Sequence, residues 1–138
     1  MRNTRLPESI KIAVANIPTA TGTALASTAV DGTGFSRITY VLTTGTAGTG
    51  ATLNMKITES ATTGGSYADI TSAALTEIAD TGGSKTYVID VPVNSAKPFQ
   101  KTVLAAAVGT FAASCSAVLY RQVSYPVAST YATQLVTV

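Results

Sequence analysis

Hydrophobic and polar residues alternate with a period of two along most of this chain, which predicts β-strands. The clearest case is the segment 51–59, in which Leu53, Met55 and Ile57 alternate with polar residues. The same period predicts further strands at 9–16, 35–44, 67–70, 85–91, 99–108 and 111–122, and a weaker one at 21–30. Residues 73–79 fit either one helical turn or a strand. No segment shows a sustained helical period, so we predict an all-β protein.

Turn residues separate these strands. Ile17-Pro18 is expected to end the first strand, because proline cannot donate to a ladder. Glycine-rich turns follow at 31–34, 45–50 and 80–84. Spacing of this kind predicts a single-domain β-sandwich or jelly roll of about eight strands. We place that domain at residues 9–122, after an extended N-terminal arm at 1–8 and before a C-terminal strand or tail at 123–138.

Two stretches without charge need separate interpretation. Residues 102–120 approach the length of a membrane-spanning helix. Several hydroxyl residues and a natural break at Val108-Gly109-Thr110 favour two strands instead, so we expect no membrane partner. The tail ends in Gln134-Leu135-Val136-Thr137-Val138, a β-prone pattern. It fits either a last strand in the domain's own sheet or a strand added to a neighbouring subunit.

Composition changes this picture toward a protein that works in contact with others. Charged residues make up 12% of the 138 residues, against about 25% in an average soluble domain. Such a sparsely charged surface is more stable when neighbours cover much of it. The net charge of +2 comes without a basic run, which argues against a nucleic-acid partner. No secretory signal is visible, so we expect synthesis in a cytoplasm.

The chain is poor in reactive groups. It has no histidine, which removes the commonest general base and metal ligand. The single cysteine, Cys115, lies in an apolar segment and is interpreted as a small core residue. Glu59, Asp69 and Asp90 lie in or next to strands, where a solvated or capping role explains them. We therefore predict no enzyme, no catalytic residue, no cofactor, no metal and no small-molecule substrate.

One part of the chain resembles a known protein family. The strand at 50–60 ends in Glu59-Ser60 and is followed by Gly64-Gly65-Ser66-Tyr67-Ala68-Asp69-Ile70. Tyr87-Val88-Ile89-Asp90, the strand pair at 101–121 and Pro126 complete the pattern. This pattern resembles the capsid decoration proteins of tailed bacteriophages, also called cement or auxiliary head proteins. The resemblance covers about residues 35–127 and carries no catalytic signature.

The resemblance implies a structural protein on the exterior of the virion, bound to the major capsid protein and to copies of itself, most often as a trimer. It would stabilise the icosahedral shell through protein–protein contacts. We expect the contacts on the arm and the tail, at Arg2, Arg5, Leu6, Ile10, Tyr125, Tyr131, Leu135, Val136 and Val138. Removing residues 125–138 should then leave the domain folded and weaken its attachment. The alternatives are a tail, connector or head-fibre component, and a carbohydrate-binding β-sandwich module.

Overall fold

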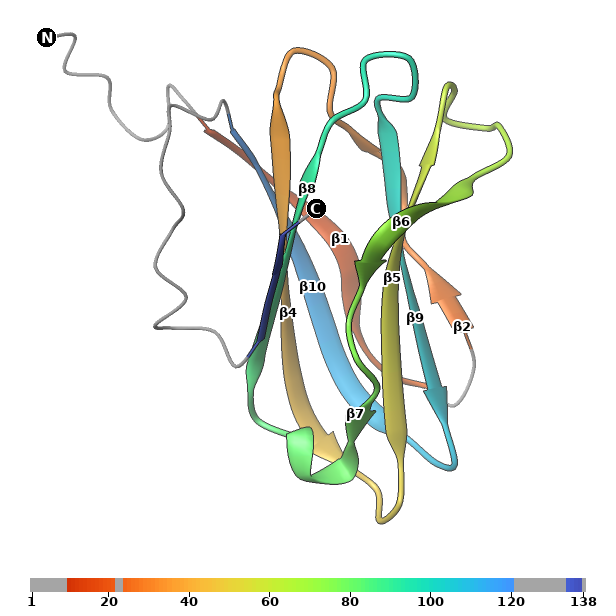
Figure 1. Cartoon of the computed structure of the whole chain (residues 1–138). Helices are drawn as coiled ribbons and strands as arrows, with labels where there is room; N and C mark the ends of the chain where they lie inside the picture. The colour runs from red at the N-terminus through yellow and green to blue at the C-terminus, as the bar shows by residue number, and fades with distance from the viewer. Residues whose placement is uncertain (1–9, 22–23, 121–133, 138) are drawn as a thin grey trace, which may run out of the picture.

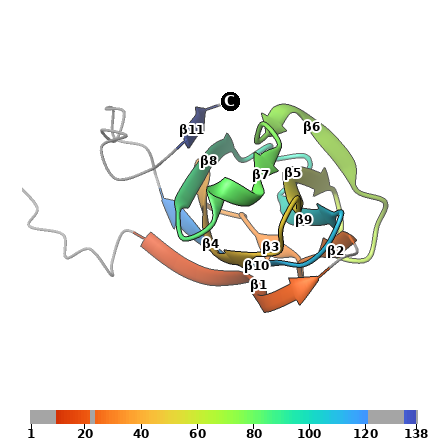
Figure 2. The same ribbon diagram turned by 90° about the horizontal axis from the view of Figure 1, so that it is seen from below.

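The computed structural model describes residues 10–21, 24–120 and 134–137, and these form a sandwich of two β-sheets (Figures 1 and 2). The five-stranded sheet has the order β1-β10-β4-β8-β11, and the six-stranded sheet has the order β2-β9-β5-β6 with β3 and β7 beside it. The strands are β1 (Ile10–Thr21), β2 (Ala24–Ala26), β3 (Val30–Asp31), β4 (Arg37–Ala47), β5 (Thr52–Ser60), β6 (Ala68–Ala74), β7 (Ile78–Ala79), β8 (Thr86–Pro92), β9 (Phe99–Ala107), β10 (Phe111–Tyr120) and β11 (Gln134–Thr137).

The connectivity is that of a jelly roll. The chain crosses from one sheet to the other between β1 and β2, and again at each step between β3 and β4, β4 and β5, β7 and β8, β8 and β9, and β9 and β10. β2 and β3 share one edge of β9, while β6 and β7 share one edge of β5. The first ten segments therefore fill eight strand positions, four in each sheet, as in a double-sheet jelly roll. This confirms the predicted fold class and strand number.

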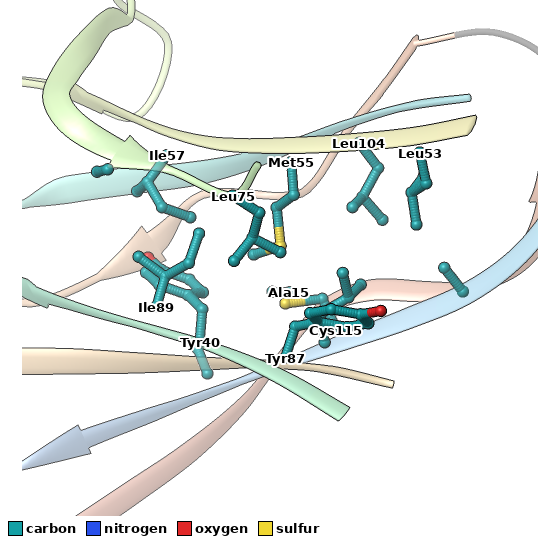
Figure 3. Close-up of a cluster of buried hydrophobic side chains, with 14 of the residues drawn as sticks. Ala15, Tyr40, Leu53, Met55, Ile57, Leu75, Tyr87, Ile89, Leu104 and Cys115 are labelled. Atoms are coloured by element: carbon teal, nitrogen blue, oxygen red, sulfur yellow. The ribbon is translucent and has the colours of Figure 1, made fainter. Parts of the chain in front are cut away.

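The core lies between the two sheets and is built from alternate residues of each long strand (Figure 3). Leu53, Met55 and Ile57 of β5 point toward the opposite sheet, which contributes Tyr40 and Ile89 to the same core. All five side chains are almost completely buried. The period-two pattern in the sequence therefore identified the inward face of β5 correctly.

One hydrogen bond crosses the core between the sheets. The Tyr40 hydroxyl of β4 donates to the Gln100 side-chain oxygen of β9 at 3.1 Å. The Gln100 amide nitrogen donates in turn to the carbonyl of Pro92 at 3.1 Å. Gln100 is fully buried, so these partners offset the cost of removing its amide from water.

The prediction that Ile17-Pro18 ends the first strand is wrong. β1 continues to Thr21, and its register with β10 shifts between Val14 and Asn16 and again between Asn16 and Thr19. β1 is an edge strand, where a proline can face away from the ladder and a bulge can absorb the missing hydrogen bond. The break predicted from sequence is therefore a bulge inside a longer strand.

Three further segments differ from or refine the predictions. Residues 21–30 do not form one strand, because β1 includes Thr21 and the short β2 and β3 follow separately. Residues 73–79 take the strand alternative, with β6 ending at Ala74 and β7 at 78–79. The uncharged stretch 102–120 divides between β9 and β10, which lie in different sheets and are joined through Gly109 at a φ of 124°. In the residues that the structure describes, no helix has the length and apolarity to cross a membrane.

The predicted arm at 1–8 and most of the tail lie outside the described residues. Of the tail, the structure describes Gln134–Thr137 as β11, which pairs with β8 in parallel. All the other named strand pairs are antiparallel.

Candidate interface on the outer face of the five-stranded sheet

In β1, the large hydrophobic side chain of Ile12 faces outward and the smaller one of Ala13 faces inward. Ala13 pairs with the fully buried Ala117 of β10, so this alanine faces the core and the neighbouring Ile12 faces the solvent. Ile12 is 68% exposed, which is unusual for an isoleucine in a strand. The isoleucine and alanine positions of β1 both fit a period of two, so the sequence pattern did not show which set packs inward.

The apolar character continues from β1 across the sheet. Val118 of β10 is the register partner of Ile12, and Val41 of β4 is the register partner of Val88 of β8. These three valines alternate with core residues and are half-buried on the outer face. The other side chains on this face of β4, β8 and β10 are mostly small or hydroxyl-bearing, namely Thr39, Thr43, Thr86, Ala112, Ser114 and Ser116.

Among the described residues of this outer face, the charged side chains are Arg37 and Asp90, and they neutralise each other. Arg37 Nε donates to Asp90 Oδ2 at 2.6 Å, and the two side chains are only 13% and 12% exposed. Thr39 and Tyr120 donate to Asp90 Oδ1 at 2.8 and 2.9 Å. The Tyr120 phenol is protonated at neutral pH and can donate, and burial raises its pKa further. The cluster therefore offers little unpaired charge to solvent.

The outer face of the six-stranded sheet is different. Lys56 pairs with Asp69 at 2.8 Å, and these side chains are 46% and 62% exposed. Asn54 donates to Glu77 at 3.1 Å, and the Lys101 ammonium lies 4.2 Å from the centre of the Tyr67 ring. Hydrated charges of this kind are costly to bury against another protein. The face that carries Ile12 is therefore the better candidate for a protein interface.

The groups considered for chemistry have structural partners. Cys115 is buried in the core, and burial raises its pKa to about 12, so the thiol is not a nucleophile at neutral pH. Glu59 pairs with Lys97 at 3.2 Å, while Asp69 and Asp90 form the ion pairs described above. Asp31 accepts a hydrogen bond from the amide of Thr33 within its own turn. Asp80 accepts one from the amide of Gly50, which lies in a different loop. No group of three potential metal ligands occurs among the described residues.

The structure places few of the predicted contact residues. Arg2, Arg5, Leu6, Tyr125, Tyr131 and Val138 lie outside the described part of the chain. Ile10 is half-buried and pairs with Tyr120 at the end of the candidate interface. Leu135 and Val136 lie in β11, with Val88 and Ile89 as register partners. Ile12 was not among the predicted contacts, although its alternation with Ile10 was visible in the sequence.

Comparison with known proteins identifies the fold and no family. No family model and no curated protein sequence matches the chain. A chain in the structure of the Gx strain of infectious bursal disease virus superposes with a TM-score of 0.54 and 12% identity, over 85% of this chain and 33% of that one. A chain of the VP2 subviral particle of the same virus gives a TM-score of 0.44 at 12% identity, over 88% and 33% of the two chains.

A pilus protein from Bacillus endospore appendages has a TM-score of 0.44 at 16% identity, over 82% of this chain and 88% of that chain. This chain thus spans about a third of the length of the viral chains. At 12% identity, the Gx-strain match shows a shared fold and nothing more.

Proposed function

We propose that this protein is a structural component of a virus particle, which binds the outside of an icosahedral head and stabilises its shell. Its partner is the major capsid protein, and the outer face of the five-stranded sheet makes the contact. This role needs contact area repeated by symmetry and no reactive group.

The observation that carries the proposal is the character of that outer face. It presents the exposed Ile12 beside three half-buried valines, and its described charges form one shielded ion pair. A partner that covers such a face removes apolar surface from water, which is favourable, and has few exposed charges to dehydrate. The fold shared with a chain of a virus structure supports the same role. The low charge content of the whole chain also supports it.

A binding experiment with two matched variants tests the proposal. Ile12→Asp adds a carboxylate to the edge strand of the candidate face, and Ala26→Asp adds one to the exposed edge strand of the six-stranded sheet. Both positions are exposed, so both variants should fold. Wild type and Ala26→Asp should bind purified heads lacking this protein about equally in co-sedimentation. Ile12→Asp should bind at least about tenfold more weakly, because an interface would bury its unpaired charge.

Each other outcome has a definite meaning. Failure of the wild type to bind heads would exclude the shell role, and binding to isolated tails instead would favour a tail or connector component. If Ala26→Asp lost binding and Ile12→Asp kept it, the contact would lie on the six-stranded sheet. If neither variant lost binding, neither outer face would be the contact.

A further inference from the structure

β11 is an unusual part of this sandwich. Its residues pair with β8 in parallel, from Gln134 opposite Tyr87 to Thr137 opposite Asp90. The strand lies at the edge of the five-stranded sheet, outside β8 (Figure 2). β10 and β8 both run antiparallel to β4, so β11 runs in the same direction as β10. The chain must therefore return along the sheet between these two consecutive described strands.

The register fixes how far the chain has to return. Tyr120, the last residue of β10, is level with Arg37 of β4 and thus with Pro92, the last residue of β8. β11 begins level with Tyr87, near the other end of β8. The return covers about five residues along the sheet and about three strand spacings across it, roughly 22 Å in a straight line.

The chain has more length than this return needs. β10 ends at Tyr120 and β11 begins at Gln134, which leaves thirteen residues between them. A connection of that length can reach about 45 Å when extended. The excess of about twofold would also allow the same strand to reach the corresponding edge of a neighbouring molecule.

Exchange would preserve the interactions that hold β11. β11 is the last strand that the structure describes, and its ladder is with the edge of β8. A second copy presents an identical edge, so the same four register pairs can form between molecules. An empty β8 edge would expose unpaired backbone groups, which favours filling it from one chain or the other.

We propose that Gln134–Thr137 is exchanged between copies of this protein, with β11 of one molecule completing the five-stranded sheet of the next. The exchanged strand keeps the parallel register with β8. This link between copies is independent of which protein covers the outer face, so it goes beyond the proposed function.

Cysteines placed in separate copies test the exchange. Val88→Cys and Leu135→Cys put one thiol at each position of a register pair, but in different full-length molecules carrying different tags. After co-expression in equal amounts and mild oxidation, up to about half of the Leu135→Cys chains, those whose neighbour is a Val88→Cys chain, should be disulfide-linked on a non-reducing gel. Co-expression of Val88→Cys with Thr76→Cys, an exposed position outside this ladder, should give no such product. The buried Cys115 does not compete.

A chain that carries both substitutions tests whether β11 pairs only with β8 of its own molecule. If Val88→Cys/Leu135→Cys forms a disulfide only within one chain, and the mixed single variants form none, the exchange is refuted. Absence of any disulfide would also refute it, because the register itself would be wrong. As a second measurement without cysteines, removing residues 134–138 should shift the protein from oligomers to monomers in sedimentation velocity. Unchanged oligomers would count against the exchange, and loss of head binding with the cross-link intact would count only against the shell role.

Discussion

The two outer faces of the sandwich hold their charged side chains in opposite ways. On the five-stranded sheet, Asp90 is paired with Arg37 and further bonded to Thr39 and Tyr120, with little exposure of either charged side chain. On the six-stranded sheet, Lys56 and Asp69 form an ion pair in which about half of each side chain is exposed. Removing the first face from water would therefore dehydrate less exposed charge than removing the second.

This contrast teaches that a low overall charge can be unevenly distributed. The fraction of charged residues describes the whole chain and cannot say which surface is uncharged. In this fold the alternation along β4, β8 and β10 sends valine, threonine and serine to one outer face. Lys56 of β5, Asp69 of β6 and Lys101 of β9 lie on the other.

The largest expected difference between the faces comes from removing one aspartate on each. Asp90→Ala leaves the Arg37 guanidinium, Thr39 and Tyr120 without their shared acceptor in a poorly hydrated site. The free energy of unfolding should fall by about 3 kcal/mol. Asp69→Ala breaks an exposed pair and should cost less than about 0.5 kcal/mol. Urea unfolding at pH 7 measures both, and equal losses would mean that the two faces are alike.

A smaller difference is expected from removing one tyrosine hydroxyl on each face. Tyr120→Phe removes the donor to the Asp90 carboxylate, and Tyr67→Phe removes the donor to the Thr63 carbonyl. A hydrogen bond to a partly buried charge is worth more than an exposed neutral one. We expect losses of about 1.5 kcal/mol for Tyr120→Phe and at most about 0.5 kcal/mol for Tyr67→Phe. A larger loss for Tyr67→Phe would contradict the assignment of the shielded face.

The smallest effect concerns an exposed carboxylate on the side of the six-stranded sheet. Hydrogen bonding to the side chain and then to the backbone of Thr33 lowers the pKa of Asp31 at the end of β3. A lowered pKa in the folded state stabilises the fold above the ordinary value of 3.8 and loses that contribution as the pH falls through the folded-state value.

Asp31→Asn keeps the acceptor oxygen and removes the charge. It should lower stability by less than about 0.5 kcal/mol at pH 7, because the site is exposed. Acid unfolding should show the difference from wild type disappearing below pH 3.8. A difference that persisted in acid would show that the charge of Asp31 has no part in it.

Much of the fold was predictable because alternation is a local property of the sequence. The strands at 51–59 and 85–91 agree with β5 and β8 to within a residue, and the inward residues of β5 are those expected. The prediction that Pro18 ends the first strand was wrong. A proline is not tolerated in a central strand, but in an edge strand it can be accommodated by a bulge. The residues of a strand do not by themselves show whether it lies at the edge of a sheet.

The candidate interface was less predictable for the same reason. The sequence by itself determined that this protein is all-β, poor in charge and without histidine, because these are properties of composition and of a period of two. Only the tertiary structure decided that Ile12 faces outward, that Arg37 meets Asp90 from 53 residues away, and that β11 lies beside β8. Which strands become neighbours depends on how both sheets pack over one core, and no short segment carries that information.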